Sequence, residues 1–398
     1  MKDDKEIIPV LLGADLNCYS MARAFHEAYG VKSYVFGKYE LGAVKHSKII
    51  EFTQIPEIIN KDLLLDILLD FAGNFKIKPY IFGCTDEYAL FIIDNKKYLD
   101  KSFKCICPDK NIINELSDKS FFYRKCDELG LPYPESVVVS FDDYIEKIKG
   151  LNFDFPVIIK PSNSGEYWRH PFDGMRKVYS AKSITESRNI IEKIFSSGYN
   201  KNVIIQKKIS GDNQYVITCF SDNGTVLAAC AGRVLLGEKT PKGIGNHAAV
   251  ITEKNKEIFS MASRFLSNTA YNGFSNFDVL KDETDGKYYL LEINPRQGRS
   301  NYYMTAAGMN VASIACGDVI FNDDPLCDNE IFWHCVPESE VFKECSEADK
   351  YKIKKLISSG KSFSSLNYKY DLKDPRRIFY VFANMIGYFR KYKKYGGK

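Results

Sequence analysis

One stretch near residue 285 limits what this chain can fold into more than any other. Phe277–Lys281 and Lys287–Asn294 each have the apolar and aromatic content of a short strand. The polar residues between them, Asp282–Gly286, are typical of a turn. The stretch therefore predicts a β-hairpin with charged residues at its end.

Three oxygen-bearing side chains are expected on one face of this hairpin. Alternate residues of a strand share a face, so Glu292 and Asn294 should project together, and a symmetric hairpin adds Asp278. Two carboxylates and an amide oxygen suit Mg²⁺, which leaves its other positions to water and substrate phosphates. Arg296 and Arg299 follow directly, so the ligand beside the metal should be anionic. The alternative is an acidic hairpin with an ordinary solvated face.

Length and composition describe a soluble globular protein. The chain has 398 residues, enough for two to three domains, with 45% hydrophobic and 27% charged residues. A net charge of +4 does not argue for nucleic acid as a partner. The 11 cysteines are scattered without zinc-ligand spacing, which favours reduced, intracellular thiols. With no secretory signal and no transmembrane stretch in the pattern, a cytoplasmic location is expected.

Strands and helices alternate over the first part of the chain, which predicts a parallel α/β sheet. The expected strands are Ile7–Ala14, Val31–Gly37 and Pro79–Cys84, and the expected helices are Asn17–Tyr29 and Asp62–Ala72. Ligands of such sheets sit at the carboxyl ends of strands, here near Gly13–Asp15 and Gly83–Glu87. The acids that follow Thr85 either face a ligand or serve a helix N-terminus. No dinucleotide-binding motif occurs.

A lysine ends a buried strand in the second region. Ser117–Lys119 should begin a helix that runs to about Glu128, and Phe155–Lys160 is an apolar strand with the lysine last. A buried ammonium needs an anionic partner, so Lys160 either meets an anionic ligand or snorkels at an edge.

Taken in order, the motifs DK, GLPYP, FPVIIKPS, VIIQ and FDV followed by LEINPR resemble the ATP-grasp family of carboxylate–amine ligases. The resemblance covers roughly residues 116–300 and implies a two-lobed ATP-grasp domain. It implies that Lys119 and Lys160 contact nucleotide phosphates, and that Asp278, Glu292 and Asn294 hold Mg²⁺, two ions in all. A basic turn after the VIIQ strand would hold adenine and ribose in the family. Its residues here are Gln206, Lys207, Lys208, Ile209 and Asp212. An ordinary basic turn is the alternative.

The loop 161–177, which should cover the triphosphate, departs from the family pattern. Many relatives have a glycine-rich loop there, but Gly165 and Gly174 are well separated in this chain. Trp168, Arg169 and His170 lie between them, and they serve either phosphate contact or the acceptor pocket.

The resemblance also implies a reaction. The substrate carboxylate attacks the γ-phosphate of ATP to give an acyl phosphate and ADP, and an amine then displaces phosphate to form an amide. Arg233 would contact phosphate, and Arg296 or Arg299 would bind the second charged group of the substrate or an oxyanion.

Within the family, the sequences PVLLGADLNCYSMARAFHEAYG, GCTDEY and KPSNSGEYWRHPFDGMRKVY look most like D-aspartate ligases of peptidoglycan cross-bridge synthesis. That resemblance implies D-aspartate, joined through its β-carboxylate to the lysine amine of a muropeptide precursor. Two alternatives stay open, namely a dipeptide synthase joining two small amino acids and a non-catalytic, nucleotide-binding regulatory module.

Four segments are expected. They are an N-terminal α/β (pre-ATP-grasp) domain at 1–115, ATP-grasp lobe A at 116–200, lobe B with the metal hairpin at 201–325, and a C-terminal extension at 326–398. From Arg376 onward the chain has no acidic residue, and bases flank an aromatic apolar segment. This predicts a helix that either packs on the body with a solvated basic end or contacts an anionic membrane surface peripherally.

Overall fold

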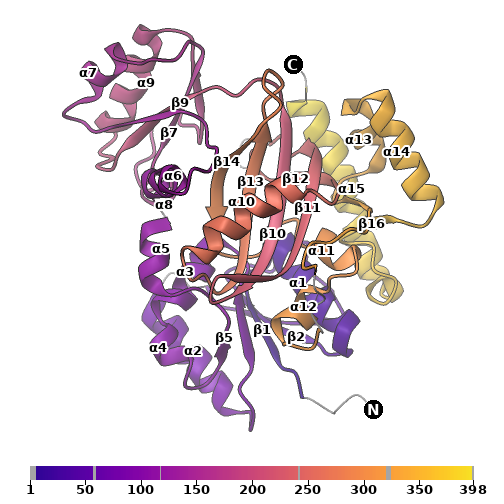
Figure 1. Cartoon of the computed structure of the whole chain (residues 1–398). Helices are drawn as coiled ribbons and strands as arrows, with labels where there is room; N and C mark the ends of the chain where they lie inside the picture. The colour runs from indigo at the N-terminus through magenta and orange to yellow at the C-terminus, as the bar shows by residue number, and fades with distance from the viewer. Residues whose placement is uncertain (1–5, 57–59, 117, 241–242, 320–323, 397–398) are drawn as a thin grey trace. The chain divides into compact units, whose positions relative to one another are not determined.

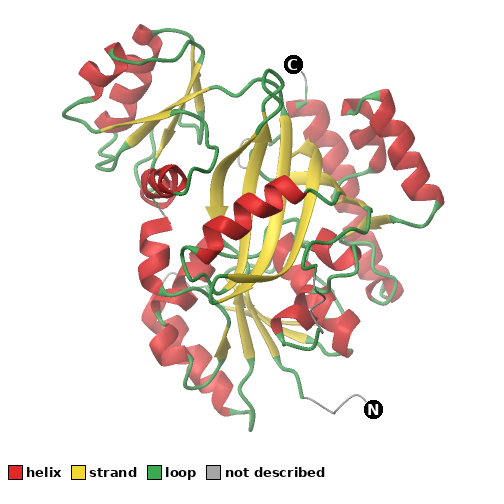
Figure 2. Cartoon of the chain, viewed as in Figure 1, coloured by secondary structure: helices red, strands yellow, loops and turns green. Residues whose placement is uncertain are grey.

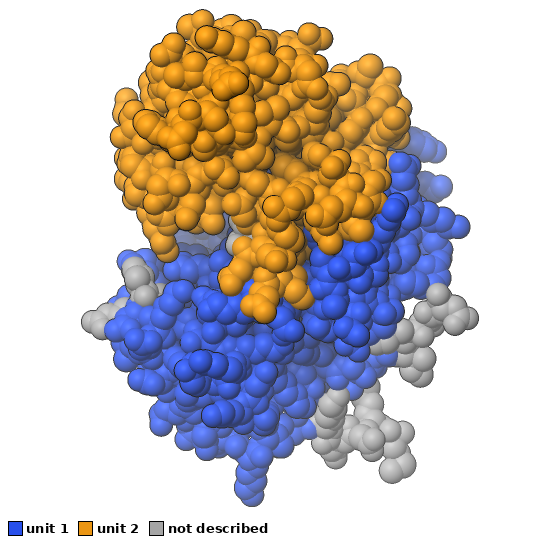
Figure 3. Space-filling model, turned by 60° about the vertical axis from the view of Figure 1, so that its left-hand side comes forward, with its two compact units in different colours: residues 1–110, 215–276, 294–398 blue, residues 111–214, 277–293 orange. Residues whose placement is uncertain are grey.

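The structure is a computed structural model, and it describes residues 6–56, 60–116, 118–240, 243–319 and 324–396 (Figure 1). Ser117, part of the predicted start of a helix, and Lys398, part of the basic tail, lie outside the described residues. The chain forms two compact units, coloured separately in Figure 3. Unit 1 comprises residues 1–110, 215–276 and 294–398, and unit 2 comprises 111–214 and 277–293. The predicted domain limits at 115, 200 and 325 stay predictions.

Unit 1 contains the parallel sheet that the sequence predicts. Its strand order is β3-β2-β1-β4-β5, and all its neighbours are parallel, with Val10 opposite both Tyr34 and Ile81. The strands are β1 (Pro9–Leu12), β2 (Ser33–Gly37), β3 (Ile50–Gln54), β4 (Tyr80–Gly83) and β5 (Lys104–Cys105). The mixed α/β fold class is confirmed, and β3 is an element that the sequence pattern did not indicate.

Local capping sets the helix limits in this part of the chain. Asp15 caps α1 (Leu16–Tyr29) by accepting from the Cys18 amide, and Gly30 ends the helix with a φ of 72°. Thr85 caps α3 (Asp86–Asp94) as predicted, its hydroxyl accepting from the Tyr88 amide at 3.4 Å. The other helices before the second region are α2 (Lys61–Gly73), α4 (Lys96–Leu99) and α5 (Lys110–Leu116).

The largest sheet has seven strands in the order β14-β13-β10-β11-β12-β15-β16 (Figure 2). They are β10 (Asn213–Asp222), β11 (Thr225–Gly237), β12 (His247–Thr252), β13 (Gly273–Lys281), β14 (Tyr288–Asn294), β15 (Phe332–His334) and β16 (Ser362–Ser364). The tight turn between β10 and β11 has positive φ at Asn223 and Gly224, which matches the twist of a two-residue hairpin. The predicted hairpin is also present, because β13 and β14 are neighbours in this sheet.

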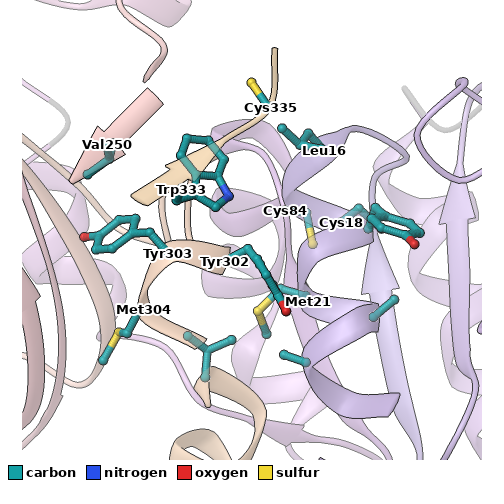
Figure 4. Packing of buried hydrophobic residues seen from close by; sticks show 14 of the residues in the cluster. Leu16, Cys18, Met21, Cys84, Val250, Tyr302, Tyr303, Met304, Trp333 and Cys335 are labelled. Carbon is teal, nitrogen blue, oxygen red and sulfur yellow. The ribbon is translucent and has the colours of Figure 1, made fainter. Parts of the chain in front are cut away.

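Apolar side chains from both of these sheets join one core in unit 1. Figure 4 shows Leu16, Cys18 and Met21 of α1 near Tyr302 and Trp333. The indole of Trp333 is fully buried and donates to the Ser365 hydroxyl at 2.9 Å, so its polar atom is satisfied. The remaining helices of this unit are α10 (Lys256–Ser267), α11 (Tyr302–Ala306), α12 (Val311–Ala315), α13 (Glu338–Glu344), α14 (Glu347–Ser358) and α15 (Pro375–Tyr395).

Unit 2 is built on a four-stranded antiparallel sheet with the order β6-β9-β7-β8. The strands are β6 (Ser136–Val139), β7 (Val157–Pro161), β8 (Tyr179–Ala181) and β9 (Val203–Lys207). The helices are α6 (Lys119–Glu128), α7 (Tyr144–Lys149), α8 (Ser164–Tyr167) and α9 (Ile184–Ser196). Val157, Ile159 and Ile205 enter the core beside α9. Because side chains alternate along strands, Lys160 and Gln206 belong to the opposite face.

The C-terminal helix α15 is held to unit 1 by buried polar contacts. The Arg377 guanidinium forms an ion pair with Asp371, Nε to Oδ2 at 3.0 Å, and both side chains are fully buried. Asp371 also accepts from the hydroxyls of Tyr19 and Ser47 and from the Lys48 amide. None of the helices in the described ranges is long and apolar enough to cross a membrane.

Candidate active site

Three lysine side chains of unit 2 surround Glu292. Lys119 begins α6, whose start is fixed because the Asp118 carboxylate accepts from the Ser120 amide at 2.7 Å. The Lys119 ammonium lies 3.2 Å from Oε2 of Glu292, and the Lys177 ammonium lies 4.0 Å from Oε1. Lys160 acts on the same carboxylate through its charge. The structure therefore brings together Lys119, Lys160 and Glu292, which the sequence predicted separately.

The electrostatics of this cluster favour an anionic ligand. Burial by itself would raise the pKa of Glu292, but the charges of Lys119, Lys177 and Lys160 outweigh it, so the pKa is lowered. The carboxylate is thus ionised at neutral pH, and three cations face one anion. The excess positive charge is what a polyphosphate would neutralise.

Lys160 is buried and bonds to a phenol rather than to a carboxylate. Lys160 is only 8% exposed, so its side chain does not extend into solvent. Its ammonium donates to the Tyr123 hydroxyl at 2.7 Å. Burial lowers the pKa of Lys160 to about 8, although the charge of Glu292 opposes the shift. An anionic phosphate oxygen would stabilise the charged form of such a buried ammonium more than that of an exposed one.

Tyr123 links the lysine to the hairpin and was missed by the sequence analysis. Its hydroxyl donates to the Leu291 carbonyl at 2.9 Å, and its ring stacks on Tyr133 with centroids 5.2 Å apart. The spacing in the sequence could have indicated this contact, because Tyr123 follows Lys119 by four residues and therefore lies on the same face of the helix. Lys177 was also missed as a partner of Glu292, since it lies at the end of a loop with no periodic pattern.

The predicted adenine-binding segment follows β9. Gln206 is buried, and its amide donates to the Ser136 hydroxyl at 2.8 Å. Lys207 and Lys208 are exposed, Ile209 is buried, and Asp212 is exposed. A cavity of about 480 Å³ lies beside the segment, lined by residues from Glu135, 152–156 and 207–211. The nucleotide roles of these residues stay predictions.

The predicted metal ligands lie on the two strands of the hairpin. Asp278 is half-buried on β13, and Glu292 is half-buried on β14. Asn294 is the last residue of β14 and belongs to unit 1, whereas the two carboxylates belong to unit 2. Among the described residues no three His, Cys, Asp or Glu side chains form a cluster that could hold a metal. Carboxylate and amide oxygens are the kind of ligand that Mg²⁺ takes beside phosphate and water, and the metal roles of these three residues stay predictions.

The loop 161–177 contains a short helix and an internal ion-pair group. Asn163 caps α8 by accepting from the Glu166 amide. Arg169 and His170 both contact the Glu166 carboxylate, at 2.9 and 3.1 Å. The loop thus satisfies these two side chains internally, and Lys177 is the loop residue that reaches Glu292.

In unit 1, the segment after β14 is fastened to the carboxyl end of β4. The Asn17 amide donates to the Cys84 carbonyl at 2.8 Å and to the Gln297 carbonyl at 3.1 Å. Asn301 in turn donates to the Asn17 side chain at 2.8 Å. Only glycine fits at position 298, because a Cβ there would lie 2.5 Å from the Asn276 amide oxygen.

This fastening holds two arginines beside acidic groups. Nε of Arg296 lies 2.7 Å from Asp86 Oδ1, and Nη2 of Arg299 lies 3.1 Å from Glu238 Oε1. Burial raises the pKa of Asp15, against the lowering effect of the Cys18 amide and of both arginines. Nη1 of Arg299 is buried and has no hydrogen-bond partner within the described part of the chain. The carboxyl edge of the parallel sheet therefore carries charges of both signs, as a zwitterionic ligand requires.

Arg233, predicted to contact phosphate, forms an ion pair with Asp349 of α14 through both of its terminal nitrogens. Contact with a phosphate would require this pair to open or to share the guanidinium. Its predicted role stays a prediction.

Comparison with known proteins defines the class. Residues 116–300 match the family model of the ATP-grasp domain. The D-aspartate ligase of Enterococcus faecium (strain Aus0004) is 33% identical over 413 aligned positions, which cover 98% of this chain and 97% of that protein. The chain belongs to the ATP-grasp family of carboxylate–amine ligases. Within that family, its whole length is similar to a D-aspartate ligase.

Solved structures show the same fold at low identity. The L-amino acid ligase of Bacillus licheniformis superposes with a TM-score of 0.57 and 13% identity, covering 79% of this chain and 74% of that chain. The biotin carboxylase domain of Hydrogenobacter thermophilus 2-oxoglutarate carboxylase, solved with MgADP, gives a TM-score of 0.59 and 15% identity, covering 80% and 71%.

Family membership confirms that the protein is an ATP-dependent ligase that forms amide bonds. The non-catalytic reading is therefore excluded. The biotin carboxylase domain named above was solved with magnesium and ADP, and its likeness to this chain, at 15% identity, concerns the fold.

Proposed function

We propose that this ligase joins the β-carboxylate of D-aspartate to the lysine side-chain amine of a peptidoglycan precursor. The assignment of D-aspartate as the substrate rests on the similarity to D-aspartate ligase over 98% of the chain. The charges of both signs at the carboxyl edge of the parallel sheet support an amino acid with a second carboxylate. A site built around charged groups discriminates strongly against substrates that lack them.

In this proposal the lysine cluster of unit 2 binds the triphosphate. Lys119, Lys160 and Lys177 offset the charge of the γ-phosphoryl group as it moves to the substrate carboxylate. Asp278, Glu292 and Asn294 would hold Mg²⁺, which would supply charge neutralisation at the phosphates. Positioning and electrostatics account for most of the acceleration of such a transfer. We assign two ions to this set, and counting bound Mn²⁺ by electron paramagnetic resonance in the nucleotide complex tests that number.

The second half of the reaction needs an oxyanion contact and a proton acceptor. The amine attacks the acyl carbon, the C–O bond to phosphate breaks, and the proton lost by the amine passes to the departing phosphate as the amide forms. Arg299, whose Nη1 is buried without a partner in the described chain, is assigned to the α-carboxylate of the substrate or to the oxyanion. Asp15 and Asp86 are assigned to binding the ammonium group of the amino-acid substrate.

Mg²⁺-dependent phosphate release with each L- and D-amino acid tests the proposal, with hydroxylamine as a surrogate amine. Hydroxamate formed with D-aspartate alone is the expected result. Hydroxamate with a different amino acid would keep the acyl phosphate and reject the substrate. Transfer to a free amino acid instead of a nucleotide-linked muropeptide would establish the dipeptide synthase alternative, whose chemistry the same residues support. No reaction with D-aspartate and muropeptide together would overturn the proposal.

A further inference from the structure

Helix α15 exposes a continuous apolar stripe to solvent. Six large apolar side chains of the helix are 37–67% exposed. They are Ile378, Phe379, Phe382, Met385, Ile386 and Phe389, here called the α15 stripe. Their spacing of three and four residues places them on one side of the helix, over about 16 Å of its length. Single exposed apolar residues are ordinary, but six in one row are not.

Another side of α15 is attached to unit 1 by buried side chains. Arg377 anchors the first turn through its buried ion pair with Asp371. Near the other end, the Tyr388 hydroxyl donates to Glu238 at 3.2 Å and the Tyr392 hydroxyl donates to the Gly237 carbonyl at 3.0 Å. Both tyrosines belong to the core of the unit. The helix therefore has a polar, buried side and an apolar, exposed side.

Exposed basic residues border the stripe. Arg390, Lys391, Lys393 and Lys394 follow it in the last turns, and all four are exposed. The helix contains no acidic residue along its 21 positions. Near the other end of the helix, the Lys45 ammonium lies 5.2 Å from the ring of Tyr380, which places a further cation beside the first turns.

We propose that α15 lies in the plane of an anionic lipid surface, with its stripe in the boundary between headgroups and acyl chains. Apolar residues flanked by Lys and Arg on a helix too polar to span are the pattern of interfacial helices. The basic residues then contact anionic headgroups. This inference does not depend on which amino acid the ligase uses.

Charge argues against a second copy of the chain as the occupant. A symmetric pair of α15 helices would bring together two surfaces that contain basic residues and no acidic ones. Such like-charge contacts oppose association. An anionic lipid surface instead complements both the stripe and its basic border.

Flotation of the full-length protein with lipid vesicles tests the proposal. We expect co-flotation with equimolar phosphatidylglycerol and phosphatidylcholine, little flotation with phosphatidylcholine alone, and weaker binding as salt rises. The triple variant Phe379→Gln, Phe382→Gln, Phe389→Gln should bind anionic vesicles at least ten-fold more weakly. These side chains are exposed, so its circular dichroism and its phosphate release in buffer should match the parent protein.

Tyr351→Gln is the matched control, because Tyr351 is a 75% exposed aromatic residue of another helix of the same unit, α14. It should leave vesicle binding unchanged. The proposal is overturned if the parent protein does not float with anionic vesicles, or if the triple variant floats equally well. A dimer that the triple variant abolishes, without any vesicle binding, would show that the stripe pairs two copies.

Discussion

At Glu292, one carboxylate is the shared partner of Lys119 and Lys177, and we propose that the same carboxylate is a metal ligand. Glu292→Gln keeps the side-chain volume and removes the charge. We expect the variant to remain folded and to lose turnover by about two to three orders of magnitude. In our proposal the substitution removes a metal ligand and weakens the electrostatic stabilisation of the transferred phosphoryl group. Phosphate release measures the loss, and circular dichroism measures folding.

The control for this substitution is Glu283→Gln, in the exposed turn of the same hairpin. It should retain parent turnover. Parent-level turnover in Glu292→Gln would remove Glu292 from the metal site.

The lowered pKa of Lys160 predicts a pH-dependent nucleotide affinity. In the folded protein the pKa is about 8, against an ordinary value of 10.5, so the amine loses its charge as pH rises through 8. A bound phosphate raises this pKa, hence nucleotide binding above pH 8 takes up a proton and weakens as pH rises. The stability of the fold changes in the other direction. Between pH 8 and 10.5 the folded state binds fewer protons than the unfolded state, so the free-energy cost of burying Lys160 falls as pH rises.

Calorimetric titration of ADP at pH 8.5 in two buffers of different ionisation enthalpy measures this proton uptake. Lys160→Arg, which stays charged, should abolish the uptake attributed to this site. Equal proton uptake in both proteins would assign the effect to another group.

We propose that Tyr123 is a positioning residue, which acts on nucleotide binding through its hydrogen bond with Lys160. Tyr123→Phe retains the stacked ring and leaves the Lys160 ammonium and the Leu291 carbonyl without this partner. We expect a stability loss of about 1–2 kcal/mol and a roughly ten-fold rise in KM for ATP, with kcat less affected. Tyr144→Phe, which removes a hydroxyl contact to Glu192 elsewhere in the unit, is the control. If KM does not change, Tyr123 has a structural role alone.

At the scale of elements, the segments that the sequence predicted share a strong local signal. The Asp118 cap and the apolar face set α6, and the Asp282–Gly286 turn closes the β13/β14 hairpin. The burial of Lys160, near the end of β7, could be expected from the apolar strand around it. Its contact with the Tyr123 hydroxyl of α6 could not be expected, because contacts between distant segments leave no periodic pattern in the sequence. The same reason hid the contact of Lys177 with Glu292. Apart from α15, the strands and helices after residue 330 carried weak patterns and were not predicted individually.

The attachment of α15 gives a prediction at this scale. Arg377→Met removes one partner of a fully buried ion pair and leaves Asp371 without its counter-charge. Such a change costs about 3–5 kcal/mol, whereas the exposed pair of Arg376 with Asp374 contributes little to stability. Urea unfolding of Arg377→Met, with Arg376→Met as control, measures the difference. Equal midpoints for the two variants would mean that the Arg377 pair does not hold the helix.

At the scale of the whole molecule, the boundary between the two compact units falls inside secondary structure. Strands β10, β13 and β14 each contain residues of both units. The sequence could indicate an ATP-grasp domain from its motifs, but it could not indicate that residues 1–110 and 294–398 would join one core with 215–276. That core depends on side chains such as Trp333 and Tyr303, which meet partners far away in the chain.

Deletion mapping of this ligase therefore has to be interpreted with care at its C-terminal end. The basic tail resembles a dispensable appendage in the sequence, and a stop codon before Arg376 would be the usual way to test it. Such a deletion also removes Tyr388, whose hydroxyl lies 3.5 Å from Nη2 of Arg299, and it uncovers the Asp371 carboxylate. A truncated protein would lose catalytic support and solubility along with its surface stripe. Point substitutions on the outer side of the helix separate these roles, and truncation cannot.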